Sequence, residues 1–111
     1  MIIPLASAAD LERACAEPLA VLYKHSPRCG VCIAAEREVR CFAEGHPAIP
    51  VYWLDVVNGR PLSQLAAAQT GVPHESPQVI LLVAGRATWT VSHWEVRALD
   101  LEEQLARVPA A

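Results

Sequence analysis

The sequence of 111 residues predicts one α/β domain, in which helices flank a small mixed β-sheet in the order βαβ–α–ββα. Three observations predict this class. Short apolar runs alternate with amphipathic segments, two runs rich in β-branched residues flank a short glycine turn, and a last amphipathic segment follows them. The length leaves room for one hydrophobic core, and therefore for a single domain over residues 1–111.

The first part of the chain predicts a strand, a helix and a buried strand. Residues 2–5 are a short apolar run. Ser7 followed by Asp10 is a capping pattern, which predicts a helix over residues 7–17 that ends at Pro18. Residues 19–23 form an unbroken apolar run, which is typical of a strand covered on both faces.

The middle of the chain predicts a helix, a strand and another helix. Cys32, Ala35, Val39 and Phe42 recur at helical spacing and predict an amphipathic helix that ends at Gly45. Residues 49–54 follow as a strand. Arg60-Pro61 and Gly71 are typical of a first helical turn and a C-terminal cap, so the next helix lies between them.

The last part of the chain predicts a β-hairpin and a closing helix. Residues 79–83 and 87–91 flank the turn at positions 84–86. Asp100 with Glu103 resembles a capping box and predicts a helix that ends before Pro109. The order of all these elements is that of the thioredoxin-like fold, with right-handed crossovers between parallel strands.

Composition excludes several classes of protein. With 53% hydrophobic and 19% charged residues and a net charge of −3, the chain is neither disordered nor a basic nucleic-acid binder. No apolar run approaches the ~20 residues of a membrane span. The first residues lack the basic region of a signal peptide, so we expect a cytoplasmic protein without nucleic-acid or membrane partners.

Cys29 and Cys32 form a C-x-x-C pair where a predicted strand becomes a predicted helix, which is typical of a redox motif. A cysteine at a helix N-terminus is stabilised as the reactive thiolate. Lys24, His25 and Arg28 lie close in sequence and are expected to lower the pKa of Cys29 further. Cys32 falls on the apolar stripe of the helix. We therefore expect Cys29 to attack a disulfide and the more buried Cys32 to resolve the product.

A zinc site is the alternative interpretation of the cysteine pair. The residues that could complete it are scattered, and no second closely spaced ligand pair exists; they are Cys15, Cys41, His25, His46 and His93. Cys41 lies about half a turn out of phase with Cys32 on the same helix. No metal is therefore expected, and no role is assigned to Cys15, a core candidate, or to Cys41.

The predicted topology brings two distant segments toward Cys29. Ser76 and Pro77 precede the third long strand, and the hairpin returns His93 and Trp94 to the same side. Each has an ordinary alternative, because Pro77 could simply begin a strand, His93 could be a surface residue, and Trp94 could pack in the core. Beside a reactive thiol, these four residues are candidates for binding substrate, and His93 could donate a proton.

Three motifs in order resemble the YtxJ-type bacilliredoxins: residues 24–26 ahead of Cys29, residues 74–78, and residues 92–94. The similarity covers about residues 19–105. It implies a thioredoxin-like fold in which Pro77 matches the cis-proline and Cys29 takes bacillithiol from mixed disulfides on client proteins. Bacillithiol would be a co-substrate, no other cofactor is implied, and a disulfide reductase could supply electrons.

The chain departs from the patterns that it resembles at two places. Bacilliredoxins of this type typically carry a serine three positions after the active cysteine, whereas this chain carries Cys32 and so a dithiol. Thioredoxin carries a buried carboxylate and a tryptophan where this chain has Tyr23 and Arg28. The first hypothesis is therefore removal of bacillithiol; the alternatives are a general protein-disulfide reductase and a non-catalytic zinc- or thiol-binding module.

Overall fold

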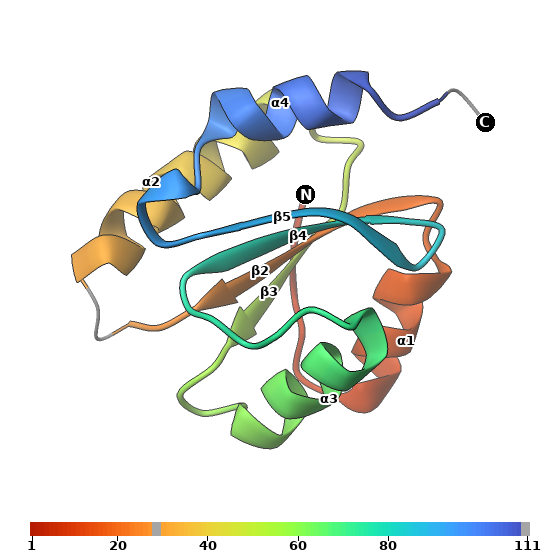
Figure 1. The fold of residues 1–111 in the computed structure, drawn as a ribbon, viewed down its shortest axis with the longest axis vertical. Helices are drawn as coiled ribbons and strands as arrows, with labels where there is room; N and C mark the ends of the chain where they lie inside the picture. Colours follow the sequence, from red (N-terminus) through yellow and green to blue (C-terminus); the bar gives the residue numbers. More distant parts are fainter. Residues whose placement is uncertain (28–29, 110–111) are drawn as a thin grey trace.

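The computed structural model describes residues 1–27 and 30–109. Its strands form one five-stranded sheet with helices on both faces (Figure 1). The elements, in chain order, are β1 Ile2–Pro4, α1 Ala8–Ala16, β2 Leu19–His25, α2 Gly30–Gly45, β3 Val51–Asp55, α3 Arg60–Thr70, β4 Gln78–Val83, β5 Arg86–Ser92, the 3₁₀ turn η1 His93–Glu95, and α4 Ala98–Ala106.

The sheet is mixed, as the sequence predicts. Its strand order is β1-β3-β2-β4-β5, and β1 and β2 both run parallel to β3. β4 runs antiparallel to β2 and to β5. Helices α2 and α4 cover one face of the sheet and α1 and α3 cover the other, which confirms the predicted fold class (Figure 1).

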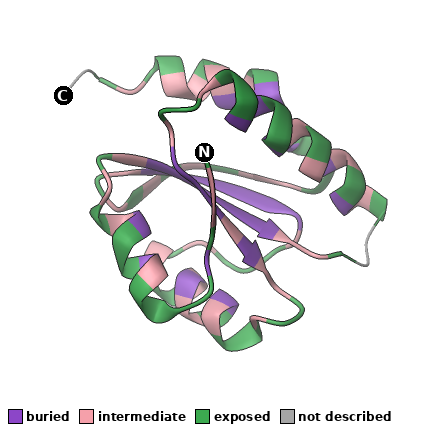
Figure 2. Cartoon of the chain, turned by 180° about the vertical axis from the view of Figure 1, so that it is seen from behind, coloured by how far each residue is buried: buried purple, intermediate pink, exposed green. Residues whose placement is uncertain are grey.

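Alternate residues of β2 support the two faces. Val21 and Tyr23 belong to the core under α2 and α4, whereas Ala20 and Leu22 belong to the core under α1 and α3. All four are fully buried, and Figure 2 shows the buried centre of the sheet in purple. Because both faces of this strand are covered, its sequence is an unbroken apolar run. Each large apolar side chain buried in this way stabilises the fold by about 1.5–3 kcal/mol.

The register places three distant residues in one row across the sheet. Lys24 of β2 lies opposite Gln78 of β4, and Gln78 lies opposite Ser92 of β5. β2 therefore ends where β4 begins and where β5 ends. The predicted return of residues 76–78 and 92–94 to the end of β2 is confirmed at this edge of the sheet.

The two predicted capping boxes differ in outcome. At α1, the Ser7 side chain accepts a hydrogen bond from the Asp10 backbone N–H, and the Asp10 side chain accepts one in return. The box predicted at Asp100 is wrong, because α4 already begins at Ala98. A residue of α2 supplies the acceptor instead: Glu38 Oε1 accepts from Ala98 N at 3.0 Å. A tertiary contact of this kind leaves no local signal in the sequence.

The β4–β5 turn requires left-handed backbone at both central residues. Ala84 has φ 50° and Gly85 has φ 79°, which is the geometry of a tight hairpin turn. A Cβ atom built on Gly85 would lie 2.5 Å from the carbonyl oxygen of Cys15. Gly71, which ends α3 with φ 73°, has open space around the corresponding position.

Gly85→Ala is expected to lower the free energy of unfolding by about 3 kcal/mol, because backbone strain and a steric clash add together. Gly71→Ala is the control, since it adds strain alone and is expected to cost about 1 kcal/mol. Urea unfolding followed by circular dichroism measures both variants. Equal losses would show that the contact between Gly85 and Cys15 does not constrain the turn.

Candidate active site

The start of α2 and the loop before β4 meet at the end of the sheet. Cys32 is 1% exposed, and its Sγ lies 4.0 Å from Ser76 Oγ. α2 begins at Gly30, directly after Cys29 in the sequence. Cys29 and Arg28 lie outside the described residues. The geometry thus places the thiol expected to resolve the disulfide in a buried position beside the loop of Ser76.

Backbone contacts hold the two loops of this edge together. The Ser76–Pro77 peptide is cis, as the resemblance implies. The N–H of His93 donates to the carbonyl oxygen of Pro77 at 2.9 Å. His93 itself has φ 57°, a left-handed conformation that few residues other than glycine, asparagine, aspartate and histidine adopt. This hydrogen bond joins the loop of residues 74–77 to the start of η1.

The side chains of η1 face solvent. His93 Nε2 lies 3.3 Å from Glu75 Oε2, and both side chains are about half exposed. Trp94 is 66% exposed, so the alternative that it packs in the core is wrong. η1 packs against α2, and Ile33 of that helix is equally exposed. A surface of imidazole, carboxylate and apolar groups consequently lies next to the start of α2.

Burial disfavours the charged forms of two residues that were expected to lower the pKa of Cys29. Desolvation lowers the pKa of His25, and this effect outweighs the opposing charges of Glu36 and Asp55. Desolvation also lowers the pKa of Lys24. Lys24 follows Tyr23 in a strand, so its side chain points to the face covered by α1 and α3. Lys24 therefore lies on the face of the sheet opposite α2, and its expected effect on the pKa of Cys29 stays a prediction.

Lys24 and Gln78 are polar residues inside an otherwise apolar layer. Lys24 is 0% exposed and Gln78 is 2% exposed. Within residues 1–27 and 30–109, neither Lys24 Nζ nor Gln78 Oε1 has a hydrogen-bond partner, although Gln78 Nε2 donates to the carbonyl oxygen of Pro73 at 3.1 Å. An unpaired buried ammonium is costly, so Lys24 reduces the stability of the fold.

A cluster that the sequence analysis missed lies on the opposite face. The hydroxyl of Tyr23 lies 2.9 Å from His25 Nδ1, and His25 Nε2 lies 3.4 Å from Glu36 Oε1. Trp53 packs edge-on against Tyr23, and the guanidinium of Arg40 lies 4.7 Å from the Trp53 ring centroid. The spacing of Tyr23 and His25 by two in a strand, and of Glu36 and Arg40 by four in a helix, is the signal that could have revealed it.

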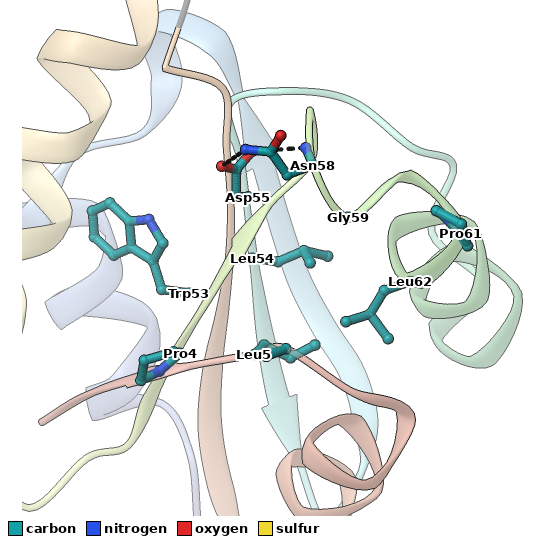
Figure 3. A pocket seen from close by; sticks show the side chains of 10 residues that line it. Pro4, Leu5, Trp53, Leu54, Asp55, Asn58, Gly59, Pro61 and Leu62 are labelled. Carbon is teal, nitrogen blue, oxygen red and sulfur yellow. Dashed lines mark hydrogen bonds between the residues drawn. The ribbon is translucent and has the colours of Figure 1, made fainter.

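Two pockets flank the start of α3. The first, of about 540 Å³, is mainly apolar, and Figure 3 shows Leu5, Leu54 and Leu62 converging in it. Asp55 and Asn58 form its polar edge through a hydrogen bond of 2.8 Å. The second pocket, of about 560 Å³, is lined by Val56, Val57, Arg60, Ser63, Gln64 and His74. Only the second pocket shares a loop with the Cys32 site, because His74 and Ser76 belong to the same segment.

The remaining cysteines lie apart from this edge. Cys15 is a half-buried free thiol of α1, and burial raises its pKa. Cys41 is exposed on α2. Across the described part of the chain, no three histidine, cysteine or acidic side chains are close enough to hold a metal ion. None of the described helices has the length and apolar character of a membrane span.

Lys24→Met is expected to raise the free energy of unfolding by on the order of 1 kcal/mol at neutral pH, because it removes a buried unpaired charge and keeps the shape. The folded-state pKa of Lys24 lies below 10.5, so the unfolded chain binds more protons as the pH rises toward that value. The wild type therefore gains stability with pH relative to the variant. Urea unfolding at pH 7 and pH 10 measures the difference.

Arg86→Met is the control for this variant, because Arg86 is an exposed cation at the far end of β5. It is expected to change the free energy of unfolding by less than about 0.5 kcal/mol at either pH. A Lys24→Met variant less stable than the wild type would contradict the absence of a compensating partner.

Known proteins share this fold and sequence pattern. A structure of a protein with a thioredoxin fold, proposed to be an oxidoreductase, is 28% identical, covers 92% of this chain and 91% of its own, and superimposes with a TM-score of 0.85. Thioredoxin from Fasciola hepatica is 25% identical over 94% of this chain and 96% of its own, with a TM-score of 0.70. Thioredoxin from Trypanosoma brucei brucei is 19% identical over 96% and 88%, with a TM-score of 0.75, and supports the fold alone.

The family follows from a match over most of the chain. The model of the monothiol bacilliredoxin BrxC family matches residues 3–101, a range that includes both cysteines of the C-x-x-C pair, the Ser76–Pro77 loop and η1. The fold and the arrangement of these loops agree with that match. The chain belongs to the monothiol bacilliredoxin BrxC family.

Proposed function

We propose that this protein is a thiol-disulfide oxidoreductase that removes bacillithiol from mixed disulfides on client proteins, with Cys29 as the nucleophile and Cys32 as the resolving thiol. One observation carries the proposal. Cys32, three positions after Cys29 in the sequence, is a buried thiol 4.0 Å from Ser76 Oγ and next to the cis Ser76–Pro77 peptide. The family match supports a thiol-based redox role.

The reaction consists of two thiol-disulfide exchanges. The Cys29 thiolate attacks the bacillithiol sulfur of the mixed disulfide, and the client cysteine leaves as a thiolate. The Cys32 thiolate then attacks Cys29, bacillithiol leaves as a thiolate, and an intramolecular disulfide forms. Two electrons from a low-molecular-weight thiol or from a disulfide reductase must reduce that disulfide before the next cycle.

The burial of Cys32 supports this division of roles. At 1% exposed, its sulfur is inaccessible to a disulfide on the surface of a client protein. Cys29, three positions before it in the sequence, would be its partner in the release step. Bacilliredoxins of the monothiol class need an external thiol for release, so Cys32 would give this chain an internal route.

The loop of residues 74–77 and η1 suit the binding of substrate: Ser76 is half-buried and Pro77 is buried, whereas His93 and Trp94 are exposed. Ser76 and Pro77 would contact the chain on either side of the client disulfide, and Trp94 offers an exposed apolar surface to the client. The imidazole of His93 would donate a proton to the departing thiolate or hold a carboxylate of bacillithiol. Its contact with Glu75 at 3.3 Å orients the ring when it is charged. Such chemistry belongs to a reducing compartment, and we place the protein in the cytoplasm.

The reduced protein is expected to release clients from bacillithiol faster than from glutathione or from a plain protein disulfide. Stopped-flow assays with one client peptide in the three forms compare the rates directly. Equal rates for all three would favour a general protein-disulfide reductase. Stoichiometric zinc that resists mild chelation, with no exchange in any form, would favour the non-catalytic module instead.

Cys32→Ser is expected to take bacillithiol from the client at nearly the rate of the wild type and to retain it on Cys29, because only the release step needs the second thiol. Intact-protein mass spectrometry after a single turnover detects the adduct. Cys41→Ser is the matched control on the same helix and should release bacillithiol normally. Loss of the first transfer in Cys32→Ser would overturn the role assigned to Cys32.

A further inference from the structure

The second pocket at the start of α3 is here called the α3 pocket. Among the residues that the structure describes, none of those lining it carries a carboxylate; they are Val56, Val57, Arg60, Ser63, Gln64 and His74. Its charged or titratable members are Arg60 and His74. Ser63 is 3% exposed, and its hydroxyl lies 2.8 Å from His74 Nδ1. When this hydroxyl donates to Nδ1, the imidazole carries its proton on Nε2. The described lining of the pocket then offers a guanidinium and an imidazole N–H, and no anionic side chain.

Two buried polar side chains, Lys24 and Gln78, lie near His74 of the α3 pocket. Gln78 is bound to the carbonyl oxygen of Pro73, the residue before His74, and its own Oε1 has no partner among the described residues. Lys24, its cross-strand neighbour, likewise leaves Nζ unpaired. Desolvation lowers the pKa of His74, and the charges of Lys24 and Arg60 add to this effect, whereas the charge of Glu75 opposes it. Two cations therefore act on His74 from its surroundings, against one carboxylate.

The acidic groups nearby are already engaged. Glu75, next to His74 in sequence, lies 3.3 Å from His93. Asp55 accepts hydrogen bonds from the N–H groups of Val57 and Asn58 and from the Asn58 side chain, and these bonds hold its pKa low. Neither carboxylate is among the residues that line the α3 pocket. Among the described residues, the charges of Lys24 and Arg60 thus meet no carboxylate in the lining of the pocket, although Glu75 acts on His74 from outside it.

We propose that the α3 pocket binds a carboxylate of the low-molecular-weight thiol during exchange, with Arg60 and His74 as its donors and Lys24 as a buried positive charge behind them. The inference rests on the proposed function, because it concerns the small-thiol half of the mixed disulfide. It assigns recognition of that half to the side of the sheet opposite α2. The client protein is left to the exposed surface of Trp94, and His93 would hold a further carboxylate of bacillithiol.

The reach between the two sites supports this assignment. His74 and Ser76 are two residues apart, so their Cα atoms lie within about 7 Å of each other. Ser76 contacts Cys32, and His74 lines the α3 pocket. One short loop thus links the Cys32 site to the α3 pocket, and a small thiol that carries a carboxylate would extend along this loop. A thiol without a carboxylate would make the same exchange but leave the pocket unused.

Binding of a carboxylate is tested first without any thiol chemistry. Succinate is titrated into the reduced ¹⁵N-labelled protein, with uncharged succinamide and inorganic phosphate as comparisons. We expect succinate alone among the organic probes to shift the amide signals of Val57, Ser63 and His74, and Arg60→Gln to weaken its binding on the order of three- to ten-fold. Arg86→Gln, at the far end of the sheet, is the control and should bind as the wild type does.

Kinetics then connect the pocket to the exchange reaction. One client peptide is presented as its mixed disulfide with bacillithiol or with 2-mercaptoethanol, which has no carboxylate. Arg60→Gln is expected to raise KM for the first substrate by a similar three- to ten-fold, with kcat within about two-fold, and to leave KM for the second unchanged. Arg86→Gln should change neither.

The two measurements separate failure of the inference from failure of the proposed function. Absence of succinate-induced shifts at the pocket overturns the inference, whatever the protein does to disulfides. Tighter binding of phosphate than of succinate overturns the assignment to a carboxylate. Equal changes in KM for both substrates overturn the link to the small thiol. A wild type that binds succinate at the pocket but exchanges neither substrate contradicts the proposed function and, with it, the role assigned to the pocket.

Discussion

The antiparallel pairing of β4 with β2 is the constraint on which the candidate site depends. This pairing reverses the chain, so that β4 begins where β2 ends, and the hairpin returns β5 to the same edge. The row Lys24, Gln78, Ser92 fixes the register of all three strands there. A slip by one residue would turn every side chain of β4 to the other face and remove Ser76 from Cys32. The burial of both faces of β4 makes such a slip costly, since Val79 and Ile80 belong to different cores.

The alternation of side chains along β2 divides the edge into two chemical environments. Tyr23 and His25 point toward α2, where they contact Trp53 and Glu36. Lys24, between them, points toward α3. One short strand therefore supplies an aromatic and imidazole cluster to the face of α2, which carries Cys32, and a positive charge to the face of the α3 pocket. The loop of residues 74–77 joins the two environments, because His74 serves one and Ser76 serves the other.

The sequence was sufficient to predict the fold because its signals are local and agree with one another. The apolar stripe of α2, the Ser7 cap and the glycine turn at Gly85 each specify an element without reference to the rest of the chain. The site was predicted less completely. The return of residues 76–78 and 92–94 to the end of β2 followed from topology. The effect of Lys24 on Cys29, expected from their proximity in sequence, stays a prediction, although the period of two in a strand turns Lys24 away from α2. The cap of α4 by Glu38 and the exposure of Trp94 are set by tertiary packing and left no pattern to find.

A second cysteine in a family of the monothiol class raises the question of which step it would change. Cys32 belongs to the apolar stripe of α2, the face that packs on the sheet, and serine at that position would fit the same space. The presence of cysteine instead of serine at this position therefore affects the chemistry of the site more than the packing of α2. A sulfur that is 1% exposed cannot compete with Cys29 for a client disulfide. Under the proposed mechanism the additional thiol leaves the first transfer unchanged, and it replaces a collision with an external thiol by an intramolecular attack of high effective concentration.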